Sequence, residues 1–195
     1  ILYIDDGSSD GSIKIFNSHT SKFQKQCISN GKNYGRSFSR NEGIRNAKGD
    51  YIIFLNSNVK IVGSNLIENY IKALQEGISI GFGQIRYTTS DKSFERYLNN
   101  PFRGVNNVKD GASINPAICL FSNCIAKKSI IKNADLFNEK LIGYGGEEID
   151  IAYRINSHAP GILRYISRSI VIRLNHPNLI CHAKRIEQFG NSNYH

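Results

Sequence analysis

The apolar run Tyr51-Ile-Ile-Phe-Leu55 stops abruptly at the polar tripeptide Asn56-Ser57-Asn58, and this junction constrains the fold more than any other stretch. The run follows Gly49-Asp50 and is too short for a typical helix. We therefore interpret it as a strand buried on both faces, in the middle of a parallel sheet. Ligands of open α/β sheets bind beyond the carboxyl ends of such strands, so we expect the tripeptide to lie at a binding site.

The rest of the chain alternates between strand-like and helix-like patterns. Strands are predicted over residues 1–4, 25–29, 78–87, 117–125 and 162–174, and helices over residues 12–18, 36–49, 67–77, 94–98, 127–133, 147–155 and 180–189. This alternation predicts an α/β fold with a mainly parallel central sheet flanked by helices. No repeat or linker divides the chain, so we treat residues 1–195 as a single domain.

Composition narrows the class of partner. The 195 residues carry a formal net charge of +9, which suits a nucleotide diphosphate, a nucleic acid or an acidic membrane surface, or merely keeps the protein soluble. The basic residues are dispersed, which disfavours nucleic acid. The four cysteines lack the spacing of a metal site, so we expect them to be reduced and buried. No apolar run could cross a bilayer and no signal peptide is visible, which predicts a cytoplasmic protein.

Two polar clusters could bind a ligand. Asp5 and Asp6 follow the first predicted strand, where carboxylates can accept hydrogen bonds from a nucleobase or ribose, or can simply cap the next helix. Arg36 and Arg40 fall one turn apart on one helix face, near a helix start that would suit an anion. The alternative is an ordinary pair of surface arginines.

Taken together, these stretches resemble the inverting family 2 glycosyltransferases of the GT-A fold. Five motifs of that family occur in order over nearly the whole chain: Asp5–Gly11; Asn33, Gly35, Arg40, Asn41 and Gly43; Tyr51–Asn58; Phe121-Ser122-Asn123; and Gly143–Arg154. The resemblance implies a nucleotide-binding half at residues 1–87 and an acceptor and catalytic half at residues 88–195. It also implies that the natural protein is longer at its N-terminus by about one βα unit, roughly 30–50 residues.

The resemblance further implies a role for individual residues. Donor binding would fall to Asp5, Asp6, Arg36, Arg40, Asn56 and Ser57, and acceptor binding to Gly145, Gly146 and Glu147. Glu148 occupies the position of the catalytic base, and Glu147 beside it would orient the acceptor. The metal position would involve Asn58 and His176, with His182 a weaker candidate.

Two departures from the family pattern bear on activity. The family's Glu-Asp pair is Glu147-Glu148 here, so the base is one methylene longer. The family's Asp-x-Asp is Asn56-Ser57-Asn58, and neutral amide oxygens are poor ligands for Mn²⁺ or Mg²⁺. The expected metal site is therefore weak or absent. Lys60, Arg36 and Arg40 could offset the charge of the diphosphate in a metal-independent reaction.

Two functions remain open at this point. The leading hypothesis is an inverting transferase that moves a sugar from a nucleotide-sugar donor, with UDP-sugars favoured, to a carbohydrate or lipid-linked acceptor in bacterial polysaccharide or glycoconjugate synthesis. Such an enzyme would work in the cytoplasm, with peripheral association at the inner membrane face left open. The alternative is a decayed relative that keeps the donor fold as a binding or scaffold module.

Overall fold

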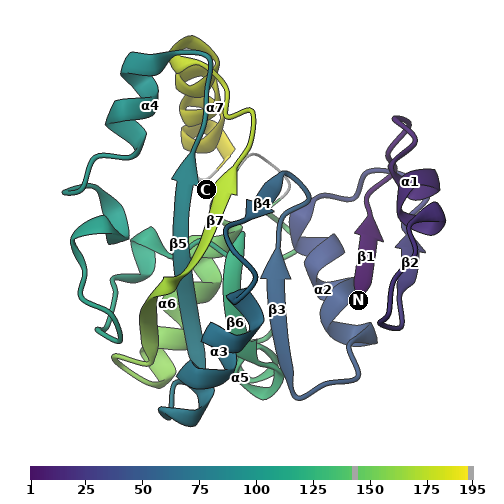
Figure 1. Ribbon diagram of the computed structural model, residues 1–195, viewed down its shortest axis with the longest axis horizontal. Helices are drawn as coiled ribbons and strands as arrows, with labels where there is room; N and C mark the ends of the chain where they lie inside the picture. The colour runs from purple at the N-terminus through teal and green to yellow at the C-terminus, as the bar shows by residue number, and fades with distance from the viewer. Residues whose placement is uncertain (142–144, 193–195) are drawn as a thin grey trace.

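The computed structural model describes residues 1–141 and 145–192, and Figure 1 shows how its helices and strands are arranged. The strands are β1 (Leu2–Asp5), β2 (Gln26–Ser29), β3 (Tyr51–Leu55), β4 (Val59–Ile61), β5 (Ile80–Tyr87), β6 (Asn123–Lys127) and β7 (Leu163–Arg173). The helices are α1 (Ser12–Ser18), α2 (Arg36–Asn46), α3 (Leu66–Gln75), α4 (Lys92–Leu98), α5 (Lys128–Asn133), α6 (Glu147–His158) and α7 (Leu179–Ser192). This alternation confirms the predicted α/β class. Within the described residues, no helix is both long and apolar enough to span a bilayer.

The strands form two sheets instead of one mainly parallel sheet. β1 and β2 pair in parallel, and the larger sheet has the order β3-β6-β5-β7-β4. In the larger sheet β5 and β7 are parallel, whereas the pairs β3–β6, β5–β6 and β4–β7 are antiparallel. The prediction of a mainly parallel sheet is therefore wrong for the described residues. The apolar runs identified the strands but carried no information on their direction, and β6 inserts between β3 and β5 in the opposite sense.

β3 lies at an edge of the larger sheet, so the prediction that it sits in the middle of a parallel sheet is wrong. It pairs with β6 on one side, and Tyr51 and Leu55 at its ends are exposed. The interior of the strand nevertheless packs on both faces, as its run of apolar residues indicated. Ile52 and Phe54 pack into the core on one face of the sheet, while Ile53 packs into the core on the other face.

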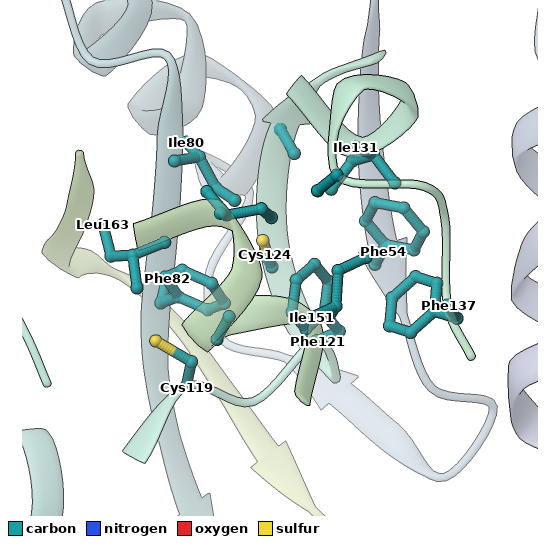
Figure 2. Packing of buried hydrophobic residues seen from close by; sticks show 14 of the residues in the cluster. Phe54, Ile80, Phe82, Cys119, Phe121, Cys124, Ile131, Phe137, Ile151 and Leu163 are labelled. Atoms are coloured by element: carbon teal, nitrogen blue, oxygen red, sulfur yellow. The ribbon is translucent and has the colours of Figure 1, made fainter. Parts of the chain in front are cut away.

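Two apolar clusters cover the two faces of the larger sheet. The larger cluster lies between the sheet and α2, α5 and α6, and Figure 2 shows its aromatic centre, where Phe54, Phe121 and Phe137 meet. Phe121 stacks edge-on against both other rings, at centroid distances of 5.5 and 5.0 Å. The smaller cluster packs α3 against the opposite face through Leu66, Tyr70 and Ala73. These cores fix the strand ends on which the site is built.

Several predicted boundaries also differ from the structure, and two of these differences have a clear local cause. α2 ends at Asn46 with Ala47 as its C-cap, and not at Gly49, because Ala47 has already turned to an extended conformation. The strand predicted over residues 117–125 begins only at Asn123. Before it, Asn115 accepts a hydrogen bond from the backbone of Ala117 and Pro116 begins a 3₁₀ turn, Pro116–Ile118. The proline favours this turn because its ring fixes the backbone angle φ.

Candidate active site

The turn after β1 organises one wall of the site. Asp5 is buried, and its Oδ2 accepts hydrogen bonds of 3.1 Å from the backbone of Gly7 and of Ser8. Gly7 has a φ of +81°, and a Cβ on it would lie 2.6 Å from the backbone of Lys32. The glycine is therefore required for close approach of the two loops. The Oδ1 of Asp5 is buried without a hydrogen-bond partner among the described residues, so Asp5 retains one acceptor for a ligand.

Asp6 holds the neighbouring loop in place. Its Oδ1 accepts hydrogen bonds from the Asn30 side chain at 3.0 Å and from the backbone of Tyr34 at 2.9 Å, and its Oδ2 accepts one from the backbone of Gly35 at 2.9 Å. Gly35 is the N-cap of α2, so Asp6 positions the start of that helix and thereby Arg36. The structure gives Asp6 an organising role beside the predicted donor contact.

Arg36 and Arg40 meet Glu147 and Glu148 across the interface between α2 and α6. Arg36 contacts Glu147 through Nε at 3.1 Å, and Arg40 contacts Glu147 through Nη1 at 2.9 Å and Glu148 through Nη2 at 2.5 Å. The Glu147 side chain is 2% exposed and that of Glu148 is 11% exposed. Buried carboxylates need such compensation, because an unpaired charge away from water is costly. Sequence motifs more than a hundred residues apart are thus brought into one electroneutral cluster.

The carboxylate of Glu148, the predicted base, is held in place by two hydrogen bonds. Its Oε1 accepts a hydrogen bond from the backbone N–H of Phe121 at 3.0 Å as well as the contact from Arg40. Burial, and then the charge of Glu148, raises the pKa of the nearby Cys119 thiol. Cys119 therefore stays neutral, and it is a poor nucleophile at this site. All four cysteines are free, but only Cys119 and Cys124 are buried, so the expected burial is right for two of them.

Gly145 and Gly146, the predicted acceptor-binding glycines, form the turn into α6. Both have positive φ, at +81° and +93°, a conformation that favours glycine. A Cβ on Gly145 would lie 2.6 Å from the ring of Phe189, so α7 packs directly over this turn. The Gly143 and Tyr144 part of the same motif lies outside the described residues.

Asn56, Ser57 and Asn58 follow β3 at the edge of the cleft. The Asn56 amide donates a hydrogen bond to the Ser122 hydroxyl at 2.8 Å, which fixes its orientation. The backbone of Asn58 accepts a hydrogen bond from Leu174, which ties the tripeptide to the end of β7. The two amides supply no anionic oxygen, and no cluster of three or more His, Cys, Asp or Glu suited to a metal occurs in the described part of the chain. This donor set does not fit a tightly bound Mn²⁺ or Mg²⁺.

His176, the other predicted metal residue, sits in an aromatic cluster beyond β7. Its ring lies 5.0 Å from that of Tyr87, 5.9 Å from Phe94 and 5.2 Å from His182. Neither ring nitrogen has a hydrogen-bond partner among the described residues. Burial, followed by the charge of Arg173, lowers the pKa of His176 to about 4. The ring is therefore neutral at physiological pH, and its contacts are those of a packed aromatic residue.

A cleft of about 990 Å³ brings the predicted donor residues together. It runs between β1 and β3, over one side of α2, and its polar end is lined by Asp5, Asp6, Arg36, Arg40, Asn56, Ser57 and Asn58. The rest of its lining combines the apolar stretches Ile1–Ile4 and Tyr51–Leu55 with polar residues, among them Gln24, Lys25, Gln26 and Lys48. Lys60 is not among the lining residues within the described range.

Four residues contribute to the site in roles that sequence reasoning did not assign. The Phe137 ring lies 5.2 Å below the Arg40 guanidinium, and Asn41 on α2 exchanges hydrogen bonds with the Phe137 backbone. Phe121 supplies a backbone N–H to Glu148, and Arg173 at the end of β7 lines the cleft beside the tripeptide. A backbone contact leaves no sequence signal, but the Arg-Asn dipeptide at Arg40-Asn41 could have suggested that one residue faces the ligand and the next anchors the helix.

Known proteins match both the sequence and the fold. The chain is 30% identical to a cholesterol galactosyltransferase of Borreliella burgdorferi over 109 residues, which cover 53% of this chain and 30% of that protein. In fold it is similar to a crystal structure of S. aureus TarS residues 1–349 in complex with UDP-GlcNAc, with a TM-score of 0.68, 14% identity, and coverage of 91% of this chain and 50% of that one. A structure of GalNAc-T7 with UDP, GalNAc and Mn²⁺ gives a TM-score of 0.66 at 15% identity, covering 91% and 38%.

These matches confirm the GT-A fold, and the chain spans half or less of the length of each of these three proteins. The sequence model of glycosyl transferase family 2 matches residues 1–171, which include every motif that carried the resemblance. The chain therefore belongs to glycosyl transferase family 2.

Proposed function

We propose that the chain binds a nucleotide-diphosphate sugar in the cleft between β1 and β3 and transfers the sugar to an acceptor hydroxyl with inversion. One observation carries the proposal: Asp5, the arginine pair and the tripeptide converge at the polar end of one cleft, next to Glu147 and Glu148. Membership of the family supports sugar transfer. The TarS structure is a complex with UDP-GlcNAc and the GalNAc-T7 structure contains UDP, which supports a uridine nucleotide as the donor.

Each part of the donor has a partner of matching chemistry. The unpartnered Oδ1 of Asp5 would accept a hydrogen bond from the nucleobase or ribose. Arg36 and Arg40 at the start of α2 would contact the diphosphate, with the positive end of the helix dipole behind them. Arg173 adds a further positive charge at the tripeptide. Because the asparagines do not fit a metal, we propose that these arginines offset the charge of the departing nucleoside diphosphate without one.

Glu148 would then take the proton of the acceptor hydroxyl. The oxygen attacks the anomeric carbon as the bond to the diphosphate breaks, so the proton passes to Glu148 and the electron pair to the leaving diphosphate. A general base of this kind contributes about 10²–10⁴-fold to the rate. The acceptor is a carbohydrate or lipid-linked hydroxyl, in line with a role in bacterial glycoconjugate synthesis.

The test is slow hydrolysis of the donor, since water can replace an acceptor that has not been identified. Release of UDP from UDP-GlcNAc and UDP-galactose should be detectable with EDTA present and should fall at least about 10²-fold in Glu148→Gln. Lys140→Ala on the exposed loop after Glu139 is a matched surface control and should hydrolyse at the unchanged rate. Binding of UDP without any hydrolysis in the unsubstituted chain would favour the non-catalytic binding module instead.

A further inference from the structure

Arg40 stands between the cleft and the two glutamates. It lines the cleft together with Arg36, whereas neither Glu147 nor Glu148 is among the described residues that line it. Arg40 is itself largely buried, with 11% of its side chain exposed, and it contacts both carboxylates. Any anion that enters the polar end of the cleft therefore meets Arg40 before Glu148.

On the basis of the proposed function, we propose that the diphosphate of the donor and Glu148 compete for Arg40, so that donor binding releases Glu148 to act as the base. Arginine presents its N–H groups as a fork that fits a phosphate as well as it fits a carboxylate. In the structure Nη2 is 2.5 Å from Glu148. When a phosphate oxygen takes this N–H group, Glu148 loses its ion pair.

The charges of the cluster favour strong competition between the diphosphate and Glu148 for Arg40. Arg36 and Arg40 together balance Glu147 and Glu148, so the cluster is electroneutral before a ligand binds. A diphosphate brings further negative charge to the same two cations. Loss of the Arg40 contact leaves Oε1 of Glu148 with a free acceptor position, which the hydroxyl of the sugar acceptor can occupy.

The surroundings let Nη2 change partner without disturbing the rest of the site. Nη1 of Arg40 keeps its contact with Glu147 at 2.9 Å, and the guanidinium rests on the Phe137 ring. The backbone N–H of Phe121 stays on Glu148 and keeps its carboxylate oriented after the arginine has moved. Arg40 is thus a positioning residue for the base as well as a ligand of the donor.

The competition predicts that removal of the base tightens donor binding. Calorimetric titration with UDP should give a Kd about tenfold lower for Glu148→Gln than for the unsubstituted chain, which is the factor that loss of one competing charge-assisted hydrogen bond implies. In an Arg40→Gln background the same Glu148→Gln change should alter the Kd by less than about twofold, because the shared partner is gone. Pyrophosphate should repeat both results, since the diphosphate carries the effect.

Glu42→Gln is the matched control. Glu42 pairs with Arg45, another arginine of α2, at 2.8 Å, and neither residue lines the cleft. Its substitution should leave the Kd for UDP unchanged. An equal Kd for Glu148→Gln and the unsubstituted chain would overturn the competition while leaving the donor site intact. The same holds if Glu42→Gln tightens binding as much as Glu148→Gln does, or if Glu148→Gln still tightens it in the Arg40→Gln background. Failure of every variant to bind UDP and pyrophosphate would refute the donor site, and the competition with it.

Discussion

Replacement of Gly83 by alanine should severely destabilise the fold. Gly83 lies on β5 at a shift in register against β7, where the side chain of Asn123 fills the space. The Asn123 amide donates to the backbone of Gln84 at 3.1 Å and of Ser169 at 2.9 Å, and it accepts from the Tyr70 hydroxyl at 2.6 Å. A Cβ on Gly83 would lie 2.3 Å from Nδ2 of Asn123 and 2.4 Å from the Ser169 oxygen.

The cost follows from the groups that would lose their partners. The Ser169 oxygen belongs to the backbone and has little room to move, so the Asn123 amide must withdraw and leave buried polar groups unsatisfied. Each such group costs about 1–3 kcal/mol, and two of them give a loss of about 4 kcal/mol. This is a large part of the 5–15 kcal/mol by which domains are typically stable. Urea denaturation followed by circular dichroism measures the change.

Gly43→Ala is the matched control for this prediction. Gly43 lies inside α2, and a Cβ on it would make an ordinary contact of 3.5 Å with Ile4. Alanine is favoured over glycine in a helix interior by about 1 kcal/mol, so this variant should be as stable as the unsubstituted chain or more so. A loss of less than about 1 kcal/mol in Gly83→Ala would refute the argument that the asparagine network is rigid.

Three further predictions concern the site and its supports. Asn56→Asp combined with Asn58→Asp should make the affinity for UDP depend on Mn²⁺, because two carboxylates supply the anionic oxygen ligands that the asparagines lack. Calorimetry with and without Mn²⁺ measures this dependence, and a double variant that responds to Mn²⁺ no more than the unsubstituted chain would contradict the prediction. The pKa of His176 is lowered to about 4, so unfolding takes up a proton between about pH 6.5 and 4 and the free energy of unfolding falls as the pH drops through this window. His176→Phe should remove about 2 kcal/mol of the loss of stability between pH 7 and pH 5, measured by urea titration at the two pH values. An unaltered pH dependence would show that the ring is not the cause. Asn41→Ala should cost about 3 kcal/mol in the same assay, because it leaves the Phe137 backbone groups without partners, and a near-neutral effect would mean that α2 does not depend on this anchor.

Most elements were predicted because they have a local signal, but the three-residue strand β4, Val59–Ile61, was not. Helix α3 follows from the spacing of its apolar residues, and the turn after β1 follows from its aspartates and glycines. Strand direction has no local signal, which is why the central sheet was predicted as parallel. The apolar run of β3 was equally misleading, because a strand whose two faces meet two different cores looks the same as one in the middle of a sheet.

The motifs assigned Arg40 and Glu148 to one site, and the structure brings the two side chains into contact although 108 positions separate them. Nothing in the sequence showed that the two side chains form an ion pair. It also did not show that both carboxylate oxygens of Asp6 accept hydrogen bonds from the loop before α2. Such pairings depend on how α2 and α6 approach each other in three dimensions, and a single sequence does not contain that information.

The central claim is that the cleft between β1 and β3 binds a nucleoside diphosphate through arginines and without a metal. Calorimetric titration of the unsubstituted chain with UDP, first in EDTA and then in Mn²⁺, tests it most directly. We predict binding in EDTA, a change in Kd of less than about twofold on addition of Mn²⁺, and at least about a tenfold loss of affinity in Arg36→Gln combined with Arg40→Gln. Absence of binding in both conditions, or binding that requires Mn²⁺, would contradict the claim.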